Sequence, residues 1–327
     1  MASPALRVHD LTVELGGVGR ILDGVSFELP RGQTLGIVGE SGCGKSMTAL
    51  AVMQLMPSPA LRITAGEIEV AGESMLRASE RRRRAMRGSE LAMIFQDPMT
   101  SLNPLYTVGD QIVESIRKNE AMPRRRAMAR AGELLGAVGI PDPERHLREY
   151  PHQLSGGKRQ RVMIAMALAG DPGLLIADEP TTALDVTVQA QIFDVLRAMQ
   201  ARLGTAIMMI THDMGAVAEM ADRVVVMYAG RVVEEGPVGD ILTAPRHPYT
   251  RGLIACIPHM ADRTFDEWPE LPAIAGTVPE LADRRHGCAF APRCPLADRH
   301  CAEAAPPLAG APGWRSACWK DPIGARQ

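Results

Sequence analysis

Two stretches near the start of the chain alternate between hydrophobic and polar positions. Leu6 to Leu15 and Ile21 to Leu29 keep this period of two, and Gly16-Gly17 lies between them. Alternation around a glycine turn predicts two antiparallel strands. Residues 62–76 repeat the pattern more briefly and predict a second short strand pair.

Short runs that are hydrophobic throughout recur along the rest of the chain. Such runs are typical of strands buried on both faces of a sheet. Stretches of helical character follow them, and this alternation predicts an α/β fold with a mostly parallel sheet and a ligand at its strand ends. The predicted strands are residues 35–38, 90–95, 174–177 and 206–210, the predicted helices 156–169, 187–202 and 215–220, and residues 224–235 form a predicted hairpin.

The remaining segments divide the chain. From Asp97 to about Glu149 the pattern is helical but interrupted by Pro and Arg, which predicts a helical subdomain inserted at about residues 97–155. The basic run Arg81 to Arg84 is interpreted as a solvated helix face rather than a lipid-phosphate contact. After Gly236 proline becomes frequent and periodicity fades. We therefore predict a main domain at residues 1–235 and an extension at 236–327.

Composition and net charge limit the classes of function that this chain can have. The chain has 327 residues, 46% of them hydrophobic, and a formal net charge of −2. Without a basic field a nucleic-acid partner is not expected. The N-terminal residues do not have a signal-peptide pattern, and no apolar run is long enough to cross a membrane. A cytosolic protein is expected, whose membrane role would depend on partners.

A glycine-rich turn connects the strand at 35–38 to a helical run. It reads Gly39-Glu-Ser41-Gly42-Cys43-Gly44-Lys45-Ser46, which is the G-x-x-x-x-G-K-[ST] pattern. Glycines let the backbone N–H groups point at phosphate oxygens, and the helix start adds partial positive charge. Lys45 can reach the β- and γ-phosphates, and the Ser46 hydroxyl can bind Mg²⁺. A purely structural glycine turn is the alternative.

Two further stretches carry candidate chemistry. The strand at 174–177 ends in Asp178, which can orient Mg²⁺, and Glu179, which can polarise an attacking water. Both acids could instead cap the next element. Ser155-Gly156-Gly157 opens a helix whose free N–H groups suit a second phosphate contact. An ordinary N-cap serine is the alternative there.

These stretches resemble, in order, the motifs of ABC-type ATPases. GESGCGKS resembles Walker A, Gln96 in FQDP the Q-loop, LSGGKRQR the signature, LLIADEP Walker B, Thr182 to Asp185 the D-loop, and His212 in ITHD the switch histidine. The resemblance implies an ABC-type P-loop ATPase with an antiparallel β subdomain, a helical subdomain and a small cysteine-containing extension. Glu179, His212 and Gln96 would be catalytic, and Ser46, Gln96 and Asp178 would hold Mg²⁺.

In this family two ATPase domains close head to tail around ATP. The resemblance therefore implies that Ser155, Gly156, Gly157 and Asp185 contact ATP held by a partner subunit. One position departs from the family pattern: Leu15 stands where an aromatic residue usually stacks on adenine. Leucine offers apolar contact without π-stacking. Cys43 is common at its position in the family and needs no redox role.

The flanking segments resemble the dipeptide/oligopeptide branch of ABC importers, and specifically the first of its two ATPase subunits. They are residues 95–104 (FQDPMTSLNP), 247–253 (HPYTRGL) and the tail from Gly287 to Cys318. The resemblance implies peptide uptake at the cytoplasmic face of the cell membrane, with two permeases, a homologous second ATPase and an extracytoplasmic solute-binding protein. The branch also includes transporters of nickel, glutathione, opines and sugar oligomers. A soluble ABC ATPase of DNA repair or translation and an exporter cassette are weaker alternatives.

Four of the six cysteines gather in the tail, with the spacing C-x5-C-x6-C-x16-C. This spacing fits neither zinc knuckles nor the compact ferredoxin run. In a cytosolic chain a cysteine cluster suggests metal more than disulfides. Because some members of the branch carry a [4Fe-4S] cluster on such a tail, the resemblance favours a cluster, with zinc, or reduced or disulfide-bonded thiols, as alternatives. Its ligands would be Cys288, Cys294, Cys301 and Cys318.

Overall fold

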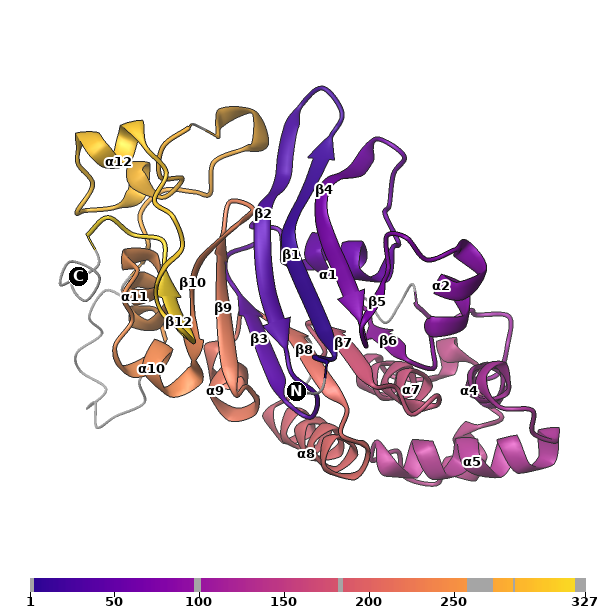
Figure 1. Cartoon of the computed structure of the whole chain (residues 1–327). Coiled ribbons are helices and arrows are strands. Elements are labelled where there is room, and N and C mark those ends of the chain that lie inside the picture. Colours follow the sequence, from indigo (N-terminus) through magenta and orange to yellow (C-terminus); the bar gives the residue numbers. More distant parts are fainter. Residues whose placement is uncertain (1–2, 97–100, 182–184, 258–272, 285, 321–327) are drawn as a thin grey trace, which may run out of the picture.

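The computed structural model describes residues 3–96, 101–181, 185–257, 273–284 and 286–320. Its first sheet is antiparallel, with the order β2-β1-β4-β5 (Figure 1). The strands are β1 (Leu6–Leu15), β2 (Gly19–Leu29), β4 (Leu61–Val70) and β5 (Glu73–Ser74). β1 lies between its two long partners, pairing Leu6 with both Leu29 and Val70. Both strand pairs expected from the alternating pattern are present.

The second sheet has eight strands in the order β11-β12-β10-β9-β3-β8-β7-β6. From β9 to β6 all neighbours are parallel, and the other pairs are antiparallel. The predicted α/β class is therefore confirmed. The bounds are β3 (Thr34–Val38), β6 (Leu91–Ile94), β7 (Leu174–Asp178), β8 (Ala206–Ile210), β9 (Arg223–Tyr228), β10 (Arg231–Pro237), β11 (Ala309–Ala311) and β12 (Trp314–Ser316).

Alternate residues of the core strands enter two different hydrophobic clusters. Ile37, Ile176 and Met208 pack with the antiparallel sheet, whereas Val38 and Leu175 pack with helices on the opposite face. Because both faces of each strand are covered, the strands read as continuous apolar runs in the sequence. These helices include α7 (Gly156–Leu168), α8 (Val186–Leu203) and α9 (Met214–Met220).

The inserted segment contains α4 (Val108–Asn119), α5 (Arg124–Ala137), α6 (Pro143–His146) and the 3₁₀ turn η1 (Pro151–Gln153). Thr107 caps α4 by accepting a hydrogen bond from the N–H of Asp110. In Figure 1, α4 and α5 lie at the opposite end of the molecule from β12. The helical character predicted for this segment is thus present in its described part, whereas residues 97–100 lie outside the described residues.

Two helices precede the inserted segment in the sequence. α1 (Lys45–Met53) follows β3, and α2 (Glu80–Met86) carries the basic run. Arg82 pairs with Glu73 and Glu90, while Glu80 receives ion pairs from Arg83, Arg84 and Arg87. The charges of this run are largely compensated within the protein.

The C-terminal extension begins with α10 (Val238–Thr243) and α11 (Pro248–Ala255). After an undescribed stretch come η2 (Leu281–Asp283), η3 (Ala291–Arg293), α12 (Arg299–Glu303) and the hairpin β11–β12. β12 pairs with β10 of the core sheet, aligning Ser316 with Glu234. The fading periodicity did not predict this hairpin, which ties the extension to the core. Within the described residues, no helix is long and apolar enough to span a membrane.

Candidate active site

The glycine-rich turn lies between β3 and α1, and its three glycines all have positive φ. A Cβ atom on Gly39, at φ +149°, would lie 2.3 Å from the Met227 carbonyl oxygen. On Gly44, at φ +108°, it would lie 2.6 Å from the Leu22 side chain. The close approach therefore excludes larger residues, and the turn can wrap tightly before α1 begins at Lys45.

Lys45 is buried at the start of α1. Its Nζ donates hydrogen bonds to the carbonyl oxygens of Gly39 at 2.6 Å and Glu40 at 3.0 Å. The ammonium group is thus held inside the turn, where a polyphosphate would lie. Cys43 is also buried, and burial raises the pKa of its thiol, which keeps it protonated and unreactive. Ser41 and Gly42 are exposed at the outer side of the turn.

Asp178 ends β7 close to the turn. Its side chain is buried, and burial raises the pKa of the carboxyl, while a hydrogen bond with Ser46 lowers it and the charge of Glu179 raises it further. The Asp178 Oδ1 atom is buried without a hydrogen-bond partner. A buried, unpartnered carboxylate oxygen beside a hydroxyl is the donor set that Mg²⁺ prefers. Ser46 and Asp178 therefore fit the predicted cation.

The structure brings together the three side chains expected to be catalytic. The Gln96 Nε2 atom donates to Glu179 Oε2 at 2.9 Å, and His212 Nδ1 lies 3.0 Å from Glu179 Oε1. These residues follow three neighbouring strands, β6, β7 and β8, at one edge of the sheet. The Glu179 side chain is 13% exposed, whereas that of His212 is 62% exposed. The carboxylate is fixed from two sides, and the histidine faces outward.

The signature residues occupy the start of α7. Ser155 accepts a hydrogen bond from the N–H of Lys158 at 3.4 Å, so it is the N-cap that the alternative interpretation expected. Ser155 and Gly156 are nevertheless exposed, and Gly157 is partly exposed. Asp185 similarly caps α8 by accepting from Val188 at 2.9 Å. Ser155 and Asp185 therefore cap helices and are also accessible on the surface. Residues 182–184 of the predicted D-loop lie outside the described residues.

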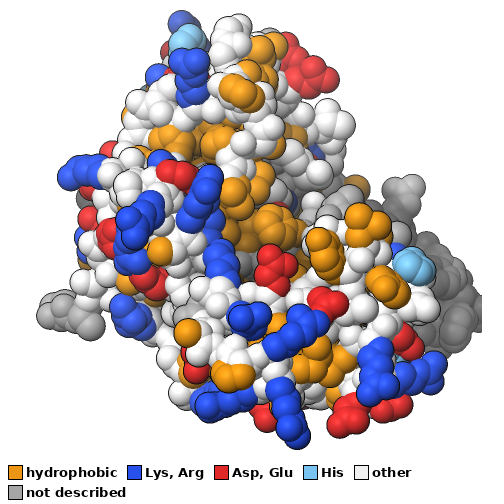
Figure 2. All heavy atoms as spheres, turned by 90° about the vertical axis from the view of Figure 1, so that its right-hand side faces the viewer, with side chains coloured by type: hydrophobic (Ala, Val, Ile, Leu, Met, Phe, Trp, Pro, Cys, Tyr) orange, Lys and Arg blue, Asp and Glu red, His pale blue; other side chains and the backbone are white. Residues whose placement is uncertain are grey.

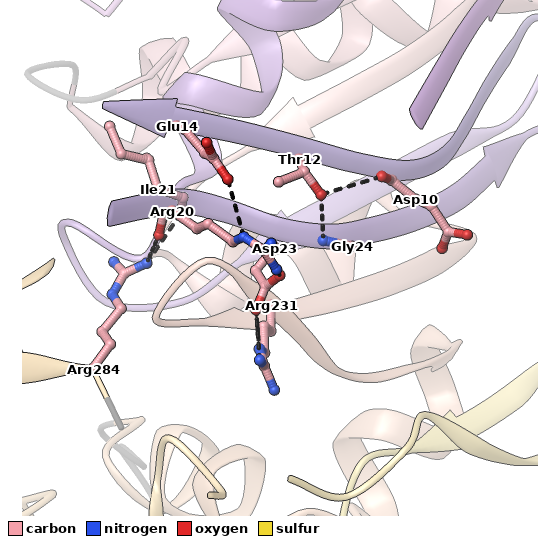
Figure 3. Close-up of polar contacts among 9 residues, drawn as sticks. All are labelled: Asp10, Thr12, Glu14, Arg20, Ile21, Asp23, Gly24, Arg231 and Arg284. Atoms are coloured by element: carbon pink, nitrogen blue, oxygen red, sulfur yellow. Dashed lines mark hydrogen bonds and ion pairs between the residues drawn. The ribbon is translucent and has the colours of Figure 1, made fainter. Parts of the chain in front are cut away.

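Leu15 ends β1, pairs with Gly19 and Leu61 and is half-buried. An extension residue reaches the same strand pair. Figure 3 shows Arg284 donating to the backbone oxygens of Arg20 at 2.8 Å and Ile21 at 3.1 Å on β2. Arg284 is separated from these partners by more than 260 residues, and no sequence motif indicated the contact. The predicted adenine position thus borders a segment that the extension stabilises.

The four tail cysteines line one small cavity of about 10 Å³. No disulfide joins any cysteine in the described part of the chain, which includes all six. Burial raises the pKa of the Cys288 thiol, opposed by hydrogen bonds from the N–H groups of Phe290 and Ala291. The N–H of Lys320 donates to Cys318 Sγ at 3.3 Å. Among the described residues, however, no three His, Cys, Asp or Glu side chains are positioned to hold a metal ion.

Comparisons with known proteins cover nearly the whole chain. Residues 22–182 match the family model described as ABC transporter, and residues 233–301 match the C-terminal region of oligopeptide/dipeptide transporters. A probable peptide ABC transporter ATP-binding protein, y4tR of Sinorhizobium fredii, is 51% identical over 96% of this chain and 94% of its own. The oligopeptide transport ATP-binding protein OppD of Bacillus subtilis is 50% identical over 93% and 85%.

Solved structures of ABC transporter cassettes are also similar to this chain. A dimeric structure of the ATP-binding cassette MJ0796 with ADP and Pi has a TM-score of 0.65 at 26% identity, covering 71% of this chain and 98% of that one. The structure of cbiO1 from Clostridium perfringens has a TM-score of 0.63 at 27% identity, covering 74% and 91%.

The glycine-rich turn, its lysine and the acids that end β7 define a P-loop nucleoside triphosphatase. Its relatives specify the group: this chain belongs to the ABC transporter family and is an ATPase. The family membership predicted from the order of the motifs is confirmed.

Proposed function

We propose that this ATPase drives the import of di- and oligopeptides. The observation that carries the proposal is the match of residues 233–301 to the oligopeptide/dipeptide transporter C-terminal region. The names of y4tR and OppD support the same solute class. Nickel, glutathione, opines and sugar oligomers are the competing solutes.

Glu179 is proposed as the general base. The donors Gln96 and His212 hold its carboxylate in one orientation, and the carboxylate accepts a proton from the water that attacks the γ-phosphate. Mg²⁺, held by Ser46, Asp178 and Gln96, would neutralise phosphate charge. Lys45 binds the phosphates through its ammonium group. The loop backbone binds them through its N–H groups at Gly39, Ser41, Gly42, Cys43 and Gly44.

A second ATPase subunit is proposed to complete the site. The residues that would contact ATP bound to a homologous partner are exposed or partly exposed: Ser155, Gly156, Gly157 and Asp185. The neighbour MJ0796 is described as dimeric, which supports this arrangement. Contacts made only in the closed state would let nucleotide binding and hydrolysis change the open-to-closed equilibrium.

The helical subdomain is proposed to contact a permease subunit, in a complex that contains two permeases. It carries an open groove of about 950 Å³, lined in part by Asp110, Met128 and Leu147. Near the start of α4, Leu105 is 80% exposed and Tyr106 is 56% exposed. Figure 2 looks onto this side of the molecule and shows hydrophobic side chains among Lys and Arg side chains. A cytoplasmic segment of a permease suits such a surface.

Through these permeases the protein would lie peripherally at the cytoplasmic face of the cell membrane. An extracytoplasmic solute-binding protein would deliver the peptide. The test is uptake of a labelled peptide by proteoliposomes that contain the complete complex. Accumulation that requires ATP supports the proposal. Transport of nickel, glutathione, an opine or a sugar oligomer in place of peptide would overturn the solute assignment.

We also propose that Cys288, Cys294, Cys301 and Cys318 hold a metal centre, a [4Fe-4S] cluster by the family resemblance. The four thiols line one cavity. N–H groups donate hydrogen bonds to the sulfurs of Cys288 and Cys318, and at Cys288 they oppose the rise in pKa that burial causes. The cavity has room for about one water molecule, and no three of the described His, Cys, Asp or Glu side chains are positioned to hold a metal ion. Binding of either centre therefore requires these side chains to move, and the larger cluster requires more movement than zinc.

Anaerobic purification with iron, sulfide and zinc analysis tests this centre. About four irons and four sulfides per chain, lost together in Cys294→Ser, would establish a cluster. Zinc without iron would replace the cluster with a structural zinc site. Protein that is active but contains neither metal would overturn the proposal and leave the ATPase assignment intact.

A further inference from the structure

An arginine of the extension contacts the glycine-rich turn directly. Arg293 Nη1 donates to Glu40 Oε2 at 2.8 Å, across 253 positions of sequence. The arginine side chain is 6% exposed and that of Glu40 is 27% exposed. Glu40 follows Gly39 and supplies one of the carbonyl oxygens bound by Lys45. The ion pair therefore reaches the residue that also anchors the phosphate-binding lysine.

Several bonds hold the Arg293 guanidinium in place. Its Nε donates to the Ala275 carbonyl at 2.7 Å and its Nη2 to the Ile274 carbonyl at 3.2 Å. Nη1 also lies 3.3 Å from the Tyr228 hydroxyl. Because the head group is fixed within the extension, its charge is presented to Glu40 in one geometry.

A second residue beyond the main domain binds the same turn. The Glu40 N–H donates to the Tyr249 hydroxyl at 2.8 Å, and Tyr249 on α11 is fully buried. The Tyr249 ring packs against Tyr228 and Phe290, with centroid distances of 4.7 and 5.3 Å. Phe290 and Arg293 both belong to the segment between Cys288 and Cys294. The segment that carries two of the four cysteines is thus packed behind the turn.

The charge of Glu40 gives this contact a consequence for nucleotide binding. The Glu40 Oε1 atom is buried without a hydrogen-bond partner, and Oε2 accepts from Arg293. Without Arg293 a partly buried carboxylate would carry an uncompensated negative charge beside the site that receives a polyanionic phosphate chain. Removing the arginine would therefore oppose MgATP binding electrostatically, in addition to loosening the turn.

We propose that Arg293 and Tyr249 are positioning residues for the phosphate-binding turn, through which the cysteine-containing extension sets the affinity for MgATP. Arg293 neutralises Glu40, and Tyr249 holds the Glu40 backbone. Neither residue takes part in the chemical step, so their effect falls on nucleotide binding rather than on turnover.

Steady-state ATP hydrolysis by the full-length chain in its assembled complex tests this role. Arg293→Gln, which removes the charge and the guanidinium hydrogen bonds, should raise the KM for MgATP about tenfold and change kcat less than twofold. Adding Glu40→Gln to that variant removes the uncompensated charge. The double variant should recover to within about threefold of the wild-type KM.

Arg315→Ala is the matched control. Arg315 also belongs to the extension and pairs with Glu235 at 2.8 Å on β10, away from the turn. The KM of the Arg315→Ala variant for MgATP should stay within twofold of the wild-type value. If Arg293→Gln does not fold, Tyr249→Phe tests the same turn through the other contact and should raise KM several-fold. An unchanged KM in the folded variant, or a raised KM that Glu40→Gln does not restore, overturns the proposal.

Discussion

Glu179 adopts a backbone conformation that residues other than glycine seldom take, with φ of +50°. Such a conformation costs about 1–3 kcal/mol and persists where the surroundings enforce it. Here the Glu179 N–H donates to the Ile210 carbonyl at 2.8 Å, while Gln96 and His212 hold the carboxylate. The strain is thus coupled to the orientation of the residue proposed to act as the base.

Leu15 provides a prediction at the same scale. Replacing this half-buried side chain by tyrosine should tighten MgATP binding at least about 5-fold, because an aromatic ring can stack on adenine and such stacking contributes about 1–3 kcal/mol per base. Isothermal titration with MgATP measures the change. Binding of tripolyphosphate, which has no base, serves as the control. Equal tightening for both ligands, or no tightening, would remove Leu15 from the adenine site.

The residues proposed for the nucleotide site could be singled out from the sequence because each group forms a short local motif. Gly39 to Ser46 form one continuous turn, and Asp178 and Glu179 lie together at the end of one buried strand. The contact of Arg293 with Glu40 could not be predicted, since its partners are 253 positions apart and meet only through tertiary packing. A lone arginine before a cysteine carries no signal for such a partner.

At the scale of elements, one buried carboxylate joins β10, the segment before α11, and β12. Glu234 is fully buried and accepts hydrogen bonds from the N–H groups of Arg246 at 2.8 Å and His247 at 2.9 Å. It also accepts from Trp314 Nε1 at 3.2 Å. Charge-assisted hydrogen bonds of this kind are stronger than neutral ones. Glu234 therefore anchors the extension to the core sheet.

Glu234→Gln should destabilise the protein by about 1–3 kcal/mol. The amide has the same size but lacks the charge, and its NH₂ group would face an N–H donor of Arg246 or His247. The thermal unfolding midpoint should fall by several degrees. Glu303→Gln is the control, since Glu303 makes an exposed ion pair with Arg299 that contributes little. Equal midpoints for the two variants would contradict the anchoring role of Glu234.

Element prediction succeeded where burial imposes a pattern and failed where it does not. The core strand at Ala206–Ile210 is buried along its full length, and the sequence run predicts its bounds. β11 (Ala309–Ala311) is short, exposed and made of alanine and glycine, so neither alternation nor a long apolar run marks it. Its place in the sheet depends on pairing with β12, which sequence order alone does not indicate.

Across the whole molecule, the phosphate-binding turn lies between two appended parts. The helical subdomain occupies one end, and the cysteine-containing extension occupies the other (Figure 1). Gln96 follows β6, which leads into the helical subdomain, and contacts Glu179. Arg293 joins the extension to the turn. The ATP site is therefore connected to the helical subdomain through Gln96 and to the extension through Arg293 and Tyr249.

The most direct test of the account is MgATP binding and hydrolysis by the assembled ATPase with Glu179→Gln. We predict that the variant binds MgATP within about threefold of wild type, while turnover falls at least about 100-fold, because a general base contributes about 10²–10⁴ in rate. Glu303→Gln should retain wild-type turnover. Hydrolysis by Glu179→Gln within tenfold of the wild-type rate would contradict the assignment of Glu179 as the base.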